Sequence, residues 1–334
     1  MNSTELLINP RTGLLRSGWR AAIFIALLNS PYLILKLFLK REEAGTVAGV
    51  EVSLEMILTY MVLVAWVVAV SWICLKFLER MKLSALGFAL HSGWFTDVLK
   101  GCATGALMIA LVVTLQIIGG MRLNGNPIWL GEQGINWTGA RIVAVDISFA
   151  LVLFILAAAF EELVFRGYAF QTLLRGAPAF VPILLFSIYF AWAHWTNPDR
   201  TLFSTANTTL AGIWLSIAYL RTRSLWFPTA LHFIWNWVMG AFFGIPVSGM
   251  RVPQNPVLLA SIGGPVWLTG GSYGSEGGAA ATVVLIIAIF VIWRARWLRV
   301  SPEMSLALSE RPQNVENSIS LGLGGGDDDL IPKT

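Results

Sequence analysis

Long apolar stretches alternate with short polar connections along most of the chain. A helix needs about 20 apolar residues to cross a hydrocarbon core roughly 30 Å thick. Eight stretches approach that length with few or no charged residues: residues 21–39, 56–75, 101–121, 142–160, 176–198, 201–220, 224–244 and 277–293. The pattern predicts an all-α, polytopic membrane protein with about eight transmembrane helices.

The composition agrees with this class. Apolar residues make up 56% of the 334 positions and charged residues only 13%, against about 25% charged in a soluble domain. A cytosolic enzyme and a disordered chain are therefore excluded, and two cysteines are too few for a secreted disulfide scaffold. The net charge of +4 does not indicate nucleic-acid binding.

The basic residues predict the orientation of the chain. Arg11, Arg16 and Arg20 precede the first apolar stretch, and no small-residue cleavage site follows it, so we expect an uncleaved anchor. With the N-terminus in the cytoplasm, most of the 23 Lys and Arg residues lie on the cytoplasmic side. We therefore expect a multi-pass protein of a bacterial plasma membrane with both termini in the cytoplasm.

Four regions follow from this organisation. Residues 1–141 hold three transmembrane helices, and residues 142–244 form a core that carries unusual polar residues. Residues 245–300 contain a loop rich in Gly and Pro, followed by the last transmembrane helix. Residues 301–334 are polar and are expected to form a disordered tail.

Two adjacent glutamates interrupt the apolar pattern of the core. Charged side chains within a membrane span are costly and are usually functional. We expect one long helix over residues 142–174, which would hold Glu161 well below the surface. Glu162 and Arg166 are four residues apart, in the order that favours an ion pair. Glu161 is turned about 100° away and is free to face another helix.

Two of the three histidines also lie in apolar stretches. His194 follows Phe190 by one helical turn, while His232 and Asn236 project from one face of another predicted helix. Hydrogen bonds between helices would explain any one of these residues. His91 lies between two spans, where we expect a solvated loop residue.

These groups are sufficient for hydrolysis without a covalent intermediate. A carboxylate and a histidine can hold and deprotonate a water molecule. A second histidine and an asparagine amide can donate hydrogen bonds to a developing oxyanion. The sequence contains no phosphate-binding loop, no cysteine pairs with metal-ligand spacing and no His-Glu-x-x-His motif, so no cofactor is expected.

Three short motifs, in order and each on its own apolar stretch, resemble those of the CPBP intramembrane proteases. This family includes CAAX prenyl endopeptidases and proteins linked to bacteriocin processing. The resemblance covers roughly residues 160–240 and rests on Glu161, Glu162, Arg166, Phe190, His194, His232 and Asn236.

The resemblance implies a membrane glutamic endopeptidase with an active-site cavity inside the membrane. By position, Glu161 would be the general base and His194 would help to orient the water. His232 and Asn236 would line the oxyanion site. Glu162, Arg166 and Phe190 would support these groups. The expected partners are the lipid bilayer and a peptide or protein substrate, lipidated or not, that undergoes CAAX-type C-terminal processing or peptide maturation.

Two other hypotheses remain open from the sequence. A zinc-dependent peptidase could use Glu161, His194 and His232 as ligands, because a Glu/His/His set is chemically adequate for zinc. A non-catalytic membrane immunity or interaction protein could keep the same residues as contacts between helices.

Overall fold

The protein is mostly helical, in agreement with the predicted class. The computed structural model describes residues 6–10, 12–38, 54–132, 134–261 and 263–309. Its longer helices are α2 (Ser17–Phe38), α3 (Leu54–Cys74), α4 (Trp94–Ile118), α5 (Trp137–Phe165), α7 (Phe180–Ala193), α8 (Leu202–Thr222), α9 (Trp226–Trp237) and α11 (Ala279–Arg294). Short helices are α6 (Tyr168–Leu174), α10 (Val266–Thr269) and α12 (Pro302–Ser309), with single turns η1 (Leu75–Glu79), η2 (Leu83–Leu86), η3 (Val238–Phe242), η4 (Gly271–Tyr273) and η5 (Ser275–Gly277).

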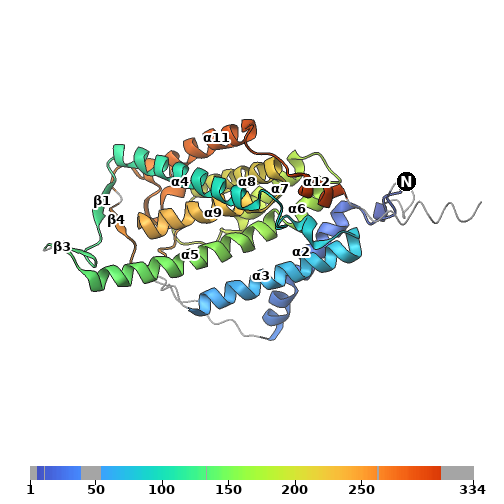
Figure 1. Cartoon of the computed structure of the whole chain (residues 1–334), viewed down its shortest axis with the longest axis horizontal. Helices are drawn as coiled ribbons and strands as arrows, with labels where there is room; N and C mark the ends of the chain where they lie inside the picture. The colour runs from blue at the N-terminus through green and yellow to red at the C-terminus, as the bar shows by residue number, and fades with distance from the viewer. Residues whose placement is uncertain (1–5, 11, 39–53, 133, 262, 310–334) are drawn as a thin grey trace, which may run out of the picture.

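Short strands join the loops at one end of the helices (Figure 1). Strand β1 (Arg122–Gly125) pairs antiparallel with β4 (Leu258–Ser261), so that Arg122 lies opposite Ser261. Strands β2 (Leu130–Gly131) and β3 (Gly134–Ile135) form a small hairpin. The N-terminal residues and α12 lie at the opposite end of the helical bundle (Figure 1).

Each of the eight predicted stretches contains a helix. In the part of the chain that the structure describes, three helical segments are long and apolar enough to cross a membrane by length and composition: Leu54–Glu79, Trp94–Ile118 and Trp137–Leu174. The membrane class is therefore supported by the fold, and the number of eight spans remains a prediction.

The long helix predicted over residues 142–174 is interrupted. Helix α5 ends at Phe165, and α6 begins at Tyr168. Gly167 lies at the break, where a Cβ atom would collide with the backbone carbonyl of Leu163. Gln171 stabilises the break because its amide donates hydrogen bonds to the carbonyl oxygens of Arg166 (3.0 Å) and Leu86 (2.8 Å).

Helix α5 occupies the middle of the bundle, with α3 along one side and α9 along the other (Figure 1). Helix α4 packs closely on α9. Gly101 and Gly105 make this approach possible, because a Cβ atom at either position would meet the backbone of α9. Small residues spaced in this way allow close contact between helices in a membrane.

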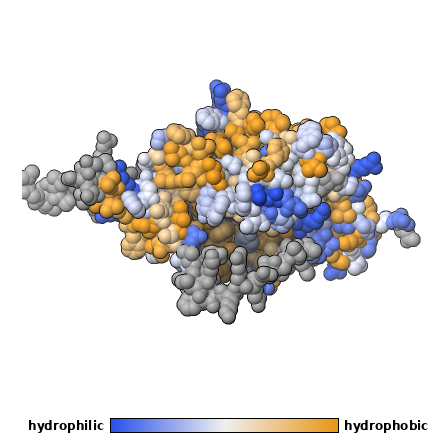
Figure 2. Space-filling view, turned by 180° about the vertical axis from the view of Figure 1, so that it is seen from behind, coloured by the Kyte–Doolittle hydropathy of each residue, from blue (hydrophilic) through white to orange (hydrophobic). Residues whose placement is uncertain are grey.

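Large apolar side chains remain exposed on the outer helices. Helix α7 exposes Leu185 (53%) and Ile188 (59%), and α11 exposes Ile286 (54%) and Phe290 (61%). Figure 2 shows hydrophobic residues in several patches on this face, with polar residues between them. Large exposed apolar side chains on several helices are typical of contact with lipid.

Two expectations about loops and ends are corrected. His91 is buried (4% exposed), with its ring 3.4 Å from the Ser224 hydroxyl and 3.5 Å from the Asp97 carboxylate, because the loop packs against the turn between α8 and α9. The predicted disordered tail does not begin at residue 301. The hydroxyl of Ser301 accepts a hydrogen bond from the Met304 amide, and Met304 is fully buried, so α12 forms. Residues 310–334 lie outside the described part of the chain.

Candidate active site

The last turn of α5 presents two carboxylates in different directions. Glu162 is fully buried, and its Oε1 lies 3.1 Å from Nη1 of Arg166, so the predicted ion pair is present. The other end of Arg166 donates a hydrogen bond of 2.9 Å to the carbonyl of Gly212 on α8. The ring of Phe190 lies 4.8 Å from the guanidinium carbon. This arginine therefore ties α5 to α7 and α8.

Glu161 faces the other way, toward a cavity. Its side chain is 24% exposed, and its Oε2 atom has no hydrogen-bond partner among the described residues. The nearest cationic atom is Nε2 of His232, at 3.8 Å, which is too long for a direct hydrogen bond. Oε2 is thus a buried acceptor without a partner, while the side chain of Glu161 borders the cavity.

His232 lies between the two carboxylates. Its Nδ1 atom is 3.0 Å from Oε1 of Glu162, and its Nε2 atom faces Glu161. Since the Glu162 carboxylate is already paired with Arg166 and acts as an acceptor, Nδ1 is the donor in this contact. Glu162 therefore fixes the orientation of the ring, as an outer partner commonly does for a functional histidine.

His194 stands at the C-terminal end of α7 rather than within a helix. Its Nδ1 atom lies 2.8 Å from the carbonyl oxygen of Phe190, and the two rings pack with centroids 4.6 Å apart. A carbonyl oxygen can only accept, so Nδ1 carries the proton. In the neutral ring Nε2 is then an acceptor, which can receive a proton from water.

One cavity of about 90 Å³ brings the predicted residues together. It is lined by side chains from α5, α7, α8, α9 and the loop before α11. Among the lining residues are Glu161, Phe190, His194, His232 and Asn236. Glu162 and Arg166 lie behind this wall and do not line the cavity.

Sequence reasoning missed part of the cavity wall. Glu276 belongs to η5, and its carboxylate accepts hydrogen bonds from the Trp235 indole (3.1 Å) and from the Ser248 amide (2.8 Å) and hydroxyl (2.7 Å). The amide of Asn207 on α8 holds this loop by donating to the Glu276 carbonyl (2.8 Å). The only signal in the sequence was the position of Glu276 directly before the apolar stretch 277–293. A charged residue at such a position is equally typical of an exposed loop.

The chemistry of the cavity is that of acids, histidines and amides. Across the residues that the structure covers, no three His, Cys, Asp or Glu side chains are grouped so that they could hold a metal ion. Carboxylates and imidazoles that line one cavity are groups that can exchange protons.

Fold and cavity together describe a helical membrane protein in which Glu161, His194 and His232 line one cavity among the helices. Residues 143–238 match the family described as "Type II CAAX prenyl endopeptidase Rce1-like". The match agrees with the resemblance to the CPBP and CAAX proteases, and it contains every residue on which that resemblance rests.

The match covers less than a third of the chain and implies a protease, which is a hydrolase acting on a protein substrate at the membrane. No curated protein sequence and no solved structure matches the chain. The family and the class of enzyme thus agree with the sequence-based prediction, whereas the roles of single residues remain proposals.

Proposed function

We propose that the protein is an intramembrane endopeptidase that uses Glu161 as a general base on water. One observation carries this proposal. Glu161 of α5, His194 at the end of α7, and His232 and Asn236 of α9 line one cavity, and an oxygen of Glu161 has no partner among the described residues. The Nε2 acceptor of His194 orients the same water. Glu161 and His194 can act on one water molecule because the carboxylate accepts one of its protons and Nε2 of His194 accepts a hydrogen bond from the other.

In the reaction the water oxygen attacks the carbonyl carbon of the scissile peptide bond, and Glu161 takes the proton. His232 and Asn236 donate hydrogen bonds to the oxyanion that forms. His232 supplies an Nε2–H when its ring carries both protons, and the neighbouring carboxylates of Glu161 and Glu162 balance that charge. The carbon–nitrogen bond then breaks, and the leaving amine receives the proton from Glu161.

Glu162, Arg166 and Phe190 are positioning residues in this proposal. Glu162 holds Nδ1 of His232 at 3.0 Å and Arg166 at 3.1 Å, and so keeps the imidazole aimed at the cavity. Phe190 supports His194 through its carbonyl and its ring. None of the three needs to touch the substrate.

The proposed substrate is a peptide or protein whose C-terminal segment enters the membrane, as in CAAX-type processing; peptide maturation is the second form of the same reaction. Residues 142–244 form the catalytic core in this scheme, within eight spans whose termini are both cytoplasmic. Trp214 and Leu215 make part of the cavity wall apolar, which suits a hydrophobic substrate segment.

A cleavage assay on the purified full chain tests the function. The substrates are a farnesylated peptide with a C-terminal CAAX sequence and the same peptide without the lipid. We expect release of the C-terminal tripeptide by the wild type, and a rate about 10²–10⁴-fold lower for Glu161→Gln, the usual loss when a general base is removed. Mass spectrometry of the products identifies the bond that is cut.

Wild-type cleavage that Glu161→Gln retains in full would disprove the role of Glu161. Where neither peptide is cut, membrane proteins of cells carrying the wild type and Glu161→Gln are compared for altered C-termini. Identical sets of C-termini in the two strains would contradict the proposed endopeptidase and would favour a non-catalytic membrane protein.

A further inference from the structure

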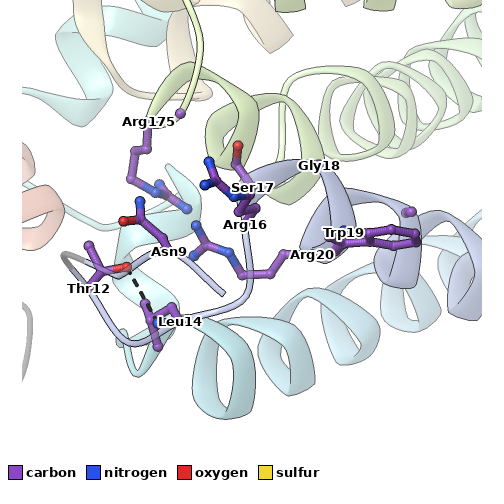
Figure 3. A pocket seen from close by; sticks show the side chains of 11 residues that line it. Asn9, Thr12, Leu14, Arg16, Ser17, Gly18, Trp19, Arg20 and Arg175 are labelled. Carbon is purple, nitrogen blue, oxygen red and sulfur yellow. Dashed lines mark hydrogen bonds between the residues drawn. The ribbon is translucent and has the colours of Figure 1, made fainter. Parts of the chain in front are cut away.

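A second cavity, of about 550 Å³, lies where α2 begins and α6 ends (Figure 3). It shares no lining residue with the cavity of Glu161. Arg16, Arg20 and Arg175 line it, together with Asn9 and Ser17. Figure 3 shows the three guanidinium groups directed toward the same space. We refer to this cavity as the arginine pocket.

The arginine pocket carries more positive than negative charge among the described residues. Glu79 of η1 supplies one carboxylate, whose Oε1 lies 3.0 Å from Nη2 of Arg175 and whose Oε2 pairs with Arg20. The Thr172 hydroxyl also donates to Oε1, at 2.9 Å. Two buried or half-buried guanidinium groups thus share a single carboxylate, which leaves one positive charge in surplus among Arg20, Arg175 and Glu79.

Unused donors of these arginines are buried. Arg20 is only 7% exposed, and its Nε atom has no hydrogen-bond partner among the described residues; the same holds for Nε of Arg175. A guanidinium group carries five N–H donors and no acceptor, so buried donors of this kind require an acceptor, which none of the described residues supplies to these two atoms.

The first turn of α2 adds further donors. Ser17 and Gly18 line the pocket and occupy the first helical positions, where backbone N–H groups have no partner within the helix. Arginines beside a helix N-terminus form a favourable site for a phosphate group, because charge-assisted hydrogen bonds and the helix dipole act together.

The surroundings of the pocket suit a membrane interface. Trp19, which lines it, is 51% exposed, and Leu6 and Leu7 nearby are 53% and 45% exposed. Tryptophan is enriched at the level of lipid headgroups. The pocket also lies at the ends of α2 and α6, not at the middle of a span.

From these observations we infer that the arginine pocket binds a phosphate group, of the kind carried by an anionic phospholipid headgroup or by a free phosphate ion. Arg16, Arg20, Arg175 and the N–H groups at the start of α2 are the donors. The bound phosphate neutralises the surplus positive charge and joins α2 to α6. This binding site is independent of the peptidase reaction.

Thermal unfolding of the purified full chain in neutral detergent tests the inference, with tryptophan fluorescence as the readout. Phosphatidylglycerol, phosphatidylcholine and inorganic phosphate are titrated separately. We expect a saturable rise in melting temperature with phosphatidylglycerol and none with phosphatidylcholine. A comparable rise with inorganic phosphate, in competition with the lipid, would identify a free ion as sufficient and would equally support the pocket.

Arg16→Gln and Arg296→Gln are the matched variants. Both remove one positive charge from an exposed side chain, and Arg296 does not line the pocket. Arg16→Gln should weaken the apparent affinity by about tenfold or more, as expected for a lost charge-assisted contact, while Arg296→Gln should leave it unchanged. Arg175→Gln, whose wild-type side chain is 20% exposed, provides a second variant with the same expectation.

Two outcomes would overturn the inference. The first is the absence of any saturable shift of the wild type with either phosphatidylglycerol or inorganic phosphate. The second is an equal loss of affinity in Arg16→Gln and Arg296→Gln, since that would indicate a general attraction between charges and not a defined pocket.

Discussion

Two clusters of arginine and glutamate hold the helices together, and they contain these two residue types in opposite proportions. Beside the proposed catalytic cavity, Glu161 and Glu162 accompany one arginine, Arg166. At the arginine pocket, Arg20 and Arg175 share one carboxylate, Glu79. Among the described residues the first cluster leaves two acceptors without a hydrogen-bond partner, Oε2 of Glu161 and Oε2 of Glu162, and one donor, Nε of Arg166. The second cluster leaves donors, among them the Nε atoms of both arginines.

The comparison indicates that an ion pair with a structural role can hold a neighbouring charged side chain in position for binding or catalysis. In both clusters an ion pair fixes the geometry, and one further charged group lies beside it. A surplus carboxylate in a cavity can take a proton from water. A surplus guanidinium near the membrane surface can bind an anion.

The two clusters also differ in their relation to the known family. Glu161, Glu162 and Arg166 all lie within residues 143–238, the segment that matches the Rce1-like family. Arg20 and Glu79 lie outside it, and Arg175 lies inside. The arginine pocket therefore joins the matched segment to the N-terminal part of the chain, through contacts between α2 and α6.

The largest loss of stability should come from breaking the ion pair between Glu162 and Arg166 in the first cluster. Glu162→Gln leaves Arg166 fully buried without a counter-charge and removes the anchor of His232. We expect the free energy of unfolding to fall by about 3–5 kcal/mol, the usual cost of breaking a buried ion pair. Thermal unfolding followed by tryptophan fluorescence measures the loss.

The neighbouring variant Glu161→Gln is the matched control for Glu162→Gln. It should melt close to the wild type, because Oε2 of Glu161 makes no hydrogen bond to the described residues. Equal melting temperatures of Glu161→Gln and Glu162→Gln would contradict the prediction that only Glu162 is needed for stability.

The next effect concerns turnover at the catalytic cavity. Asn236→Ala removes an amide that lines the cavity on the same face of α9 as His232. The rate constant kcat should fall by about 10²–10³-fold, as expected for one lost oxyanion donor, with little change in KM. Steady-state kinetics on a cleaved peptide measures both constants.

Asn255→Ala is a suitable control for this prediction. Its amide donates a hydrogen bond of 2.6 Å to Asp146, outside the catalytic cavity. It should affect stability and leave kcat near the wild-type value. Wild-type turnover by Asn236→Ala would remove that residue from the oxyanion site and would favour a contact between helices as its role.

The sequence was sufficient to predict the helical class and the rough position of each long helix. Lipid as a solvent makes this possible, because a spanning helix must be apolar along its whole length. The break at Gly167 was not predictable in this way, since Tyr168–Leu174 continues the apolar pattern of α5. The break depends on a contact of Gln171 with Leu86, which lies far away in the sequence.

The candidate site was predictable where spacing along one helix decides the contact. The Glu162–Arg166 pair and the common face of His232 and Asn236 follow from helix geometry alone. Contacts between helices were not predictable in the same way. Nothing in the spacing indicates that Glu162 would hold His232, or that Glu276 would approach the cavity from a loop.

The smallest expected effect tests the second cluster. Glu79→Gln removes the carboxylate that Arg20 and Arg175 share. The loss of unfolding free energy should be about 1–3 kcal/mol, less than for Glu162→Gln, because the Arg175 side chain is 20% exposed and solvent screens part of its charge. Phosphatidylglycerol should raise the melting temperature of Glu79→Gln more than that of the wild type, since a bound phosphate then replaces the missing negative charge. Unfolding curves of both proteins with and without the lipid measure this difference. The prediction would be contradicted if Glu79→Gln lost as much unfolding free energy as Glu162→Gln and the lipid did not change that loss. The two clusters would then respond alike to removal of a carboxylate.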